Sequence, residues 1–203
     1  GDREFGAPVV LTTLDDGSEL LLAGSKDGMM YALDPDHNGK LIWEKRLGRG
    51  GELGGIQYGF ATDGERAFVP ISDVNADFKA DGALISLDIK TGKVNWRMPS
   101  PDDTCEGKPA PCNNALTAAV TLTPQIIFAG SIDGYLRAYQ VQDGQLIWEY
   151  DTTQIVKGVN GLEGHGGSIG TAGPTITDNM LYQTSGYGGI LAGMPGNVLL
   201  AFE

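Results

Sequence analysis

Several features are missing from this 203-residue chain, and each absence excludes a class of protein. No apolar run approaches the roughly 20 residues that a membrane-spanning helix requires. Lysine and arginine total 14 against 26 aspartates and glutamates, and no basic cluster stands out, so neither nucleic acid nor an anionic membrane surface is an expected partner. There is also no Gly-x-Ser-x-Gly elbow and no phosphate-binding loop ahead of a helix, so no general hydrolytic signature is present.

Nitrogen and sulfur ligands for a metal are scarce as well. The two histidines, His37 and His165, lie in unrelated loops, which is weak support for a zinc site. His37 is expected in a solvated hairpin turn, whereas His165 stands in a glycine-rich loop and could line a pocket. The segment Asp73–Gly82 has oxygen ligands at alternating positions but lacks the glycine and the bidentate glutamate of a calcium loop. An ordinary acidic turn is the favoured interpretation, and no residue is assigned to a metal.

The chain has only two cysteines, Cys105 and Cys112, in a loop that also holds two prolines and one glycine. A disulfide is favoured over two free thiols, and it indicates an oxidising compartment such as a periplasm. The sequence starts at Gly1-Asp2, without an initiator methionine or a signal peptide. It is therefore expected to be a processed product or a piece of something longer.

Glycine is abundant, with 31 residues, and it marks an internal repeat. Gly28–Trp43 returns as Gly82–Trp96 and as Gly134–Trp148, and a shorter copy follows at Gly196–Phe202. The intervals between the tryptophans are 96 − 43 = 53 and 148 − 96 = 52 residues, a fixed period that is typical of repeat architectures. Within each full copy, two runs of alternating apolar and polar residues flank a glycine-containing turn, which predicts a β-hairpin.

Hairpins repeated about every fifty residues predict the blades of a β-propeller. The expected fold is all-β, a single domain with four blades near residues 1–47, 48–98, 99–150 and 151–203 and almost no helix. The first strands of the blades are expected near Pro8–Thr13, Tyr58–Thr62, Thr117–Leu122 and Ser168–Ile176. The tryptophans are expected to pack between blades. An open set of four blades exposes sheet edges, which favours self-association.

Five longer connections interrupt the repeat. Long loops on a rigid repeat scaffold are where binding sites are usually built. The connections are Arg46–Gly55, Asp73–Asp81, Pro99–Asn114, Asp151–Gly167 and Gly186–Pro195.

The repeated Gly-x-x-x-Ala-Leu-Asp-x-x-x-Gly-x-x-x-Trp pattern resembles that of the quinoprotein alcohol dehydrogenases, whose propellers bind pyrroloquinoline quinone (PQQ). Segments between the repeats are similar to those of the polyvinyl-alcohol dehydrogenase branch of this family: Asp2–Pro8, Ala32–Pro35, Gly50–Ile56, Gly166–Ile169, Ser185–Gly188 and Pro195–Phe202. The resemblance covers nearly the whole chain and implies the C-terminal half of an eight-bladed propeller. It also implies a periplasmic or secreted dehydrogenase that oxidises secondary alcohols, polymeric ones included, and passes electrons to a cytochrome c.

The resemblance also implies site residues. Asp2 matches the aspartate that acts as general base on the alcohol, although Gly1 stands where the family has a tryptophan. Lys26, followed by Asp-Gly, matches the lysine that contacts the quinone oxygens. Such a pair is chemically sensible, because the carboxylate takes the hydroxyl proton while the cation polarises the carbonyl that accepts hydride. Gln57 and Tyr58 occupy the place of a polar residue and a tryptophan at the edge of the cofactor pocket.

One departure and one alternative remain. Gly170 stands where the family has an acidic residue. PQQ and calcium are the implied cofactors, with the main calcium ligands expected outside this chain.

The alternative function is a non-catalytic propeller that serves as an interaction scaffold, as in outer-membrane assembly lipoproteins with the same repeats. A scaffold has no need for an acid–lysine pair directed at the central axis, so the positions of Asp2 and Lys26 distinguish the two hypotheses.

Overall fold

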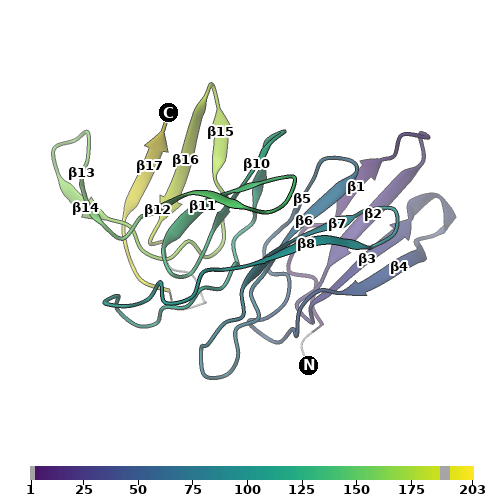
Figure 1. The fold of residues 1–203 in the computed structure, drawn as a ribbon, viewed down its shortest axis with the longest axis horizontal. Helices are drawn as coiled ribbons and strands as arrows, with labels where there is room; N and C mark the ends of the chain where they lie inside the picture. Colours follow the sequence, from purple (N-terminus) through teal and green to yellow (C-terminus); the bar gives the residue numbers. More distant parts are fainter. Residues whose placement is uncertain (1–2, 188–192) are drawn as a thin grey trace.

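The structure, a computed structural model, describes residues 3–187 and 193–203 (Figure 1). Antiparallel strands dominate it, and the described residues contain one 3-10 turn, η1 (Pro35–His37), and no α-helix. Three four-stranded sheets are followed by a two-stranded hairpin and a three-stranded sheet. The all-β repeat fold expected from the sequence is confirmed.

Each sheet runs up and down in chain order. The first contains β1 (Val10–Thr13), β2 (Glu19–Gly24), β3 (Met29–Asp34) and β4 (Lys40–Arg46). The second contains β5 (Ala61–Thr62), β6 (Arg66–Ile71), β7 (Ala83–Asp88) and β8 (Val94–Pro99). The third contains β9 (Thr121–Leu122), β10 (Ile126–Gly130), β11 (Tyr135–Gln140) and β12 (Leu146–Asp151). The hairpin is β13 (Ile155–Lys157) with β14 (Glu163–His165), and the last sheet holds β15 (Thr175–Thr177), β16 (Met180–Ser185) and β17 (Val198–Phe202).

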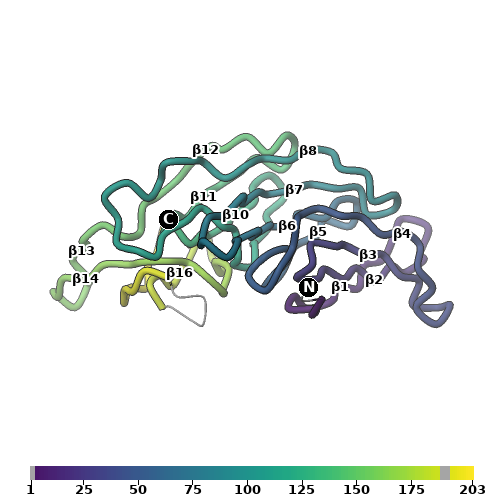
Figure 2. Tube along the Cα trace, turned by 90° about the horizontal axis from the view of Figure 1, so that it is seen from below, coloured from purple at the N-terminus to yellow at the C-terminus, as the bar shows by residue number. Residues whose placement is uncertain are grey.

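The sheets lie side by side in chain order and follow an arc rather than a closed ring (Figures 1 and 2). Within the described ranges, no strand pairing joins the first sheet to the last. Apolar side chains fill the space between neighbouring sheets: one cluster joins Leu22 and Met30 to Val69 and Ile85, and the next joins Phe68 and Leu84 to Ile127. This is how consecutive blades pack in a propeller.

The tryptophans link one sheet to the next, as expected. Trp43 on β4 donates its indole N–H to the backbone oxygen of Ile89 at 2.8 Å, just beyond β7 of the second sheet. Trp96 on β8 repeats this contact with Val141 at 3.2 Å, just beyond β11. A Cβ built at Gly144, in the hairpin turn beside Val141, would lie 2.7 Å from the Trp96 ring, so only glycine lets the indole dock there.

The first strands of three sheets are shorter than expected. Within Tyr58–Thr62, Thr117–Leu122 and Ser168–Ile176, only the last two residues pair with the next strand of their own sheet. The residues ahead of them bond to neighbouring sheets instead: Thr117 Oγ1 donates to Gly170 O at 2.7 Å, and Ala119 N donates to Thr171 O at 3.1 Å. The alternation of apolar and polar side chains in these residues therefore reflects burial between neighbouring sheets and not strand pairing.

A second correction concerns the connection Asp151–Gly167, which the sequence predicted to be a loop. It contains the hairpin β13–β14, in which Ile155 pairs with His165 and Lys157 with Glu163. Most of its side chains are exposed, Ile155 and Leu162 included. Sequence patterning did not reveal it because the hairpin buries no apolar face.

Candidate functional site

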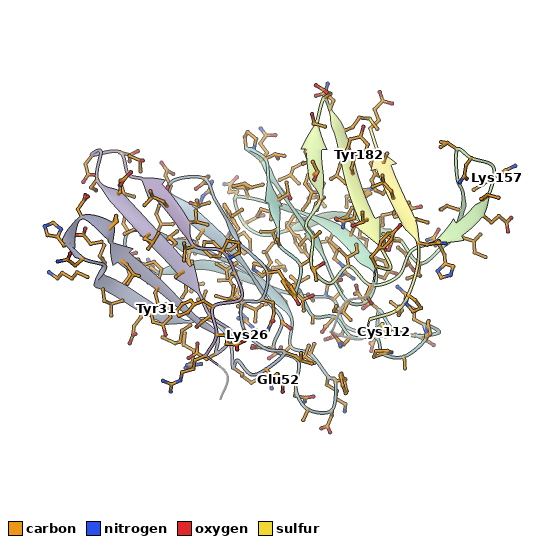
Figure 3. All side chains as sticks on the ribbon, turned by 180° about the vertical axis from the view of Figure 1, so that it is seen from behind. Lys26, Tyr31, Glu52, Cys112, Lys157 and Tyr182 are labelled. Atoms are coloured by element: carbon orange, nitrogen blue, oxygen red, sulfur yellow. A yellow bond between two sulfur atoms is a disulfide. The ribbon has the colours of Figure 1, made fainter. Side chains whose placement is uncertain are left out.

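Antiparallel topology gathers the long connections at one edge of the molecule. Each chain turn between second and third strands, and each connection between sheets, falls on the same side, because strands alternate in direction. Figure 3 shows Lys26, Glu52 and Cys112, from three such connections, along one edge, and Tyr182 on β16 away from it. We call this side the loop edge.

Lys26 lies in the tight turn that joins β2 to β3. Ser25 Oγ and the amide of Met29 both donate to the carboxylate of Asp27, and Gly28 adopts φ +81°, which closes the turn. The amide of Lys26 donates to the backbone oxygen of Glu4 at 2.9 Å, and its ammonium Nζ lies 2.9 Å from Glu4 Oε2. The lysine side chain is only 21% exposed, so the turn and the N-terminal segment hold it in place.

The backbone oxygen of Gln57 and the side chain of Lys26 both lie close to Gly6. A Cβ built at Gly6 would lie 2.6 Å from the backbone oxygen of Gln57 and 3.5 Å from Lys26 Cε. The bare Cα of Gly6 therefore permits both residues to approach. The Gln57 side chain is buried and donates to Gly54 O, and Tyr58 beside it is half-buried. Of the implied site residues, Lys26 and Gln57 thus converge, whereas Asp2 lies outside the described residues.

Two residues at this point were not singled out from the sequence, Glu4 and Gly6. Both belong to the segment Asp2–Pro8, which was noted only for its resemblance to a family. An acid and a glycine near the N-terminus carry no pattern that relates them to a turn twenty residues later. Only the path of the N-terminal segment beside Lys26 reveals the ion pair.

Asp73, the first acid of the segment Asp73–Gly82 that was interpreted as an acidic turn, has a structural role. Its carboxylate accepts the backbone amides of Arg49 at 2.7 Å, Gly50 at 3.1 Å and Gly55 at 3.0 Å. It therefore fixes the glycine-rich loop that leads from the first sheet to the second. Among the described residues, no group of three or more histidine, cysteine or acidic side chains is arranged to hold a metal ion.

The histidines and Gly170 occupy peripheral or open positions. His37 ends η1, is 73% exposed and contacts Asp34 through Nδ1 at 2.7 Å, so it is a solvated turn residue. His165 ends β14 with an exposed side chain, its Nδ1 2.8 Å from Gly166 O. A Cβ at Gly170 would lie 3.4 Å from Ile132 Cδ1, an ordinary contact, so space does not require glycine there.

Cys105 and Cys112 form the expected disulfide. The loop that it closes is fixed to the third sheet by Lys108, whose ammonium donates to Asp133 O at 2.8 Å and lies 3.2 Å from Asp151 Oδ1. The same ammonium sits 4.0 Å from the centre of the Tyr135 ring, a cation–π distance. Covalent and ionic contacts together make this loop a rigid part of the loop edge.

Acid is expected to loosen the disulfide loop. Burial by itself would raise the pKa of Asp151, but hydrogen bonds from Thr153 and the nearby Lys108 together lower this pKa below its ordinary value of 3.8. A lowered folded-state pKa means that the pair stabilises the fold above pH 3.8 and that this contribution is lost as the pH falls through the lowered value. Hydrogen exchange of the loop amides, corrected for intrinsic rates, is expected to rise about fivefold below that pH, because such a pair contributes about 1 kcal/mol. In Lys108→Met the extra acid-induced opening is expected to disappear; an unchanged response there would contradict the assignment.

Comparison with known proteins places this arrangement in a family. A family model described as outer membrane protein assembly factor BamB matches residues 2–195. The chain belongs to this PQQ-repeat family. It is 40% identical over 210 residues to a polyvinylalcohol dehydrogenase from Pseudomonas sp., and 40% identical over 214 residues to another from Sphingopyxis sp. strain 113P3. Each match covers all of this chain and 33% of the relative, so the chain spans about a third of their length.

Solved structures agree on the fold. BamB from Moraxella catarrhalis superposes with a TM-score of 0.59 and 20% identity, over 90% of this chain and 47% of that one. The quinohemoprotein alcohol dehydrogenase from Comamonas testosteroni gives a TM-score of 0.56 and 18% identity, over 89% and 29% respectively. The resemblance to the quinoprotein propellers drawn from the repeat pattern is thus confirmed for this PQQ-repeat chain.

Proposed function

We propose that this PQQ-repeat chain is part of a PQQ-dependent dehydrogenase that oxidises secondary alcohols, including polymeric ones. The observation that carries the proposal is the 40% identity to two polyvinylalcohol dehydrogenases across the whole chain. The chain would act as one propeller domain with blades near residues 1–47, 48–98, 99–150 and 151–203.

The residues around Lys26 fit a flat, anionic quinone. The Lys26 ammonium supplies a cation, and Gln57 lies beside it at Gly6. A Cβ at Gly6 would clash with the Gln57 backbone oxygen at 2.6 Å, so the bare Gly6 lets the N-terminal segment pack against both residues. A cation next to bare backbone suits a ligand that carries carboxylates and carbonyl oxygens.

When bound, PQQ would supply the hydride acceptor. Lys26 would hold a carbonyl oxygen of the cofactor by a charge-assisted hydrogen bond, with Gln57 and Tyr58 at the edge of the pocket. Asp2 would accept the proton of the alcohol hydroxyl as general base. Glu4, whose Oε2 lies 2.9 Å from Lys26 Nζ, would orient the ammonium.

The remaining partners follow from the same proposal. Calcium would accompany PQQ with most of its ligands outside this chain, and a cytochrome c would accept the electrons. A periplasmic or secreted location is supported by the disulfide between Cys105 and Cys112, since such bonds persist in oxidising compartments. No helix of the described part is long and apolar enough to cross a membrane. Self-association would complete the ring that the arc of sheets leaves open (Figure 2).

The scaffold alternative has weaker support. The matching family model carries the BamB description, and BamB from Moraxella catarrhalis shares the fold at 20% identity. The polyvinylalcohol dehydrogenase relative shares 40% sequence identity with this chain over its whole length, twice the identity of BamB. The acid–lysine pair that would distinguish the two roles includes Asp2, which lies outside the described residues.

A titration of the purified chain with PQQ and calcium tests the proposal, followed by cofactor fluorescence and by dye-linked oxidation of a secondary alcohol. Saturable binding is expected. Lys26→Met is expected to weaken it roughly tenfold, the loss of one charge-assisted hydrogen bond. Lys93→Met, an exposed lysine in a hairpin turn at the opposite edge, serves as the matched control and is expected to bind normally. No binding to the wild-type chain would refute the function for this chain, and equal binding by both variants would remove Lys26 from the site.

A further inference from the structure

An open groove of about 860 Å³ runs along the loop edge beside the disulfide loop. One wall is the tip of the β6–β7 connection, Phe78 to Ala80, and the other is formed by residues 102–106 and 112–114. Both walls are therefore loops next to the second sheet, one between β6 and β7 and the other between β8 and β9. None of the residues that line the groove is Lys26, Gln57 or Gly6, and the proposed function leaves the groove without a role.

The first wall presents an exposed aromatic ring. Phe78 is 50% exposed and has φ +58°, a backbone conformation that bulky residues rarely adopt. Hydrogen bonds within the tip hold it there: Phe78 N donates to Asn75 O at 3.0 Å, Asn75 N donates to Lys79 O at 2.8 Å, and Lys79 N donates to Asn75 Oδ1 at 3.0 Å. These hydrogen bonds therefore hold the backbone of the tip in a conformation that exposes the Phe78 ring beside the polar groove.

The second wall is preorganised. The disulfide closes it, and Lys108 binds it to the third sheet through Asp133 O and Asp151. Thr104 Oγ1 adds a hydrogen bond to Asp133 Oδ2 at 2.7 Å. A wall that is already ordered loses little conformational entropy when a ligand binds, which favours affinity.

The lining selects for hydroxyl groups and against anions. The lining contains the carboxylates of Asp102, Asp103 and Glu106 and the amides of Asn113 and Asn114, and Lys79 is the one basic residue among the described lining residues. The Asn114 amide is partly engaged within the loop, because Nδ2 donates to Pro101 O at 3.2 Å. Carboxylates and amides accept and donate the hydrogen bonds of hydroxyls. The excess of carboxylates, on a chain of net charge −12, repels a polyanion. The Phe78 ring offers an apolar contact to a carbon backbone.

A small cavity lies between the groove and the loop that precedes Gln57. This second cavity, of only about 10 Å³, shares Phe78 and Asn113 with the groove and is also lined by Leu53, Thr117 and Ile132. Leu53 is followed by Gly54, whose backbone oxygen accepts the side-chain amide of Gln57. The small cavity is therefore lined in part by the loop whose Gly54 holds the Gln57 side chain.

We propose that this groove is a docking site for a neutral polyhydroxylated polymer, with Phe78 against the carbon chain and the acids and amides on its hydroxyls. The role of the docked polymer as substrate rests on the proposed function, whereas its binding does not. The site lies apart from the reacting groups and serves to hold a long substrate near them.

Binding of a short polyvinyl alcohol oligomer to the purified chain, measured by calorimetry without PQQ or calcium, tests the proposal. Phe78→Ala is expected to weaken binding roughly fivefold, the loss of one aromatic contact. The matched control is Ile155→Ala, which removes an apolar side chain that is 74% exposed on β13 and is expected to bind normally. Glu106→Gln keeps the hydrogen-bonding shape and is expected to change the affinity less than twofold, roughly the scatter of a surface substitution.

Polylysine and polyacrylate serve as charged comparison polymers. Binding of polyvinyl alcohol that is insensitive to salt and lost in Phe78→Ala supports the groove. Preferential, salt-sensitive binding of polylysine that Glu106→Gln weakens would overturn it in favour of a simple acidic surface, and so would no binding of polyvinyl alcohol. A parallel PQQ titration separates the two proposals: PQQ binding without polymer binding refutes only the groove, and the reverse refutes only the cofactor site.

Discussion

Replacing Arg137 with methionine is expected to lower the free energy of unfolding by about 3–5 kcal/mol, the usual cost of removing one partner of a buried ion pair. The Arg137 and Asp133 side chains are both fully buried, with Nη2 2.7 Å from Oδ2. Arg137 also donates to Ser131 Oγ at 2.7 Å and lies 3.2 Å from Glu149. Burial by itself would lower the pKa of Arg137, but the charge and hydrogen bond of Asp133 raise it, so the guanidinium stays charged.

The loss comes from Asp133, which the substitution would leave as a buried, uncompensated charge. Denaturant unfolding measures this loss of unfolding free energy. Adding Asp133→Asn to Arg137→Met is expected to recover part of the loss, because the charge is removed with its partner. Lys90→Met breaks an exposed pair with Asp15 at 3.4 Å and is expected to cost less than about 0.5 kcal/mol. A cost for Arg137→Met as small as that of Lys90→Met would show that the buried pair contributes nothing.

Trp96→Ala is expected to destabilise the chain by about 3–5 kcal/mol, the range for truncating a large aromatic side chain in a packed interface. Its indole packs beside Phe68, with 6.1 Å between ring centroids, and donates to Val141 O in the third sheet. The truncation removes both the packing and the hydrogen bond between the second and third sheets. The two sheets are then expected to lose cooperativity, which a lower m-value in urea reports.

Trp148 provides the matched comparison at the same repeat position. It is 37% exposed and contacts Tyr150 and Phe202, with ring centroids 6.3 and 5.4 Å away. Trp148→Ala is expected to cost less than half as much as Trp96→Ala, since its ring is less buried. Trp96→Phe keeps one aromatic ring but removes the indole N–H and part of the packed surface, so it is expected to cost more than about 1 kcal/mol and less than Trp96→Ala. Equal losses at Trp96 and Trp148 would show that docking onto the next sheet is not the source of the stability.

The repeat made most of the fold predictable. A tryptophan every fifty residues, with glycine four residues before it, is a local pattern whose meaning does not depend on distant residues. Gly92 and Gly144 have positive φ because the hairpin turns require it, and a glycine at the turn position of each repeat predicts this conformation. The disulfide was predictable for the same reason, because its two cysteines are close along the chain.

The site was predictable only through resemblance, and in part. Lys26 and Gln57 were indicated by similarity to a family, and the structure brings them together at Gly6. Nothing in the spacing of these residues shows that Glu4 pairs with Lys26 or that Asp73 binds three backbone amides of a distant loop. Such contacts join segments that the fold makes neighbours, and their residues follow no period.

By itself, the sequence determined the all-β repeat, the turn glycines, the disulfide and the docking role of the tryptophans, because each depends on neighbours within one repeat or on its period. Only the tertiary structure decided which connections share the loop edge, how far the first strands pair, and where Phe78 faces the disulfide loop. The physical reason is that side-chain alternation reports burial, while hydrogen-bond partners and grooves depend on how separate sheets pack.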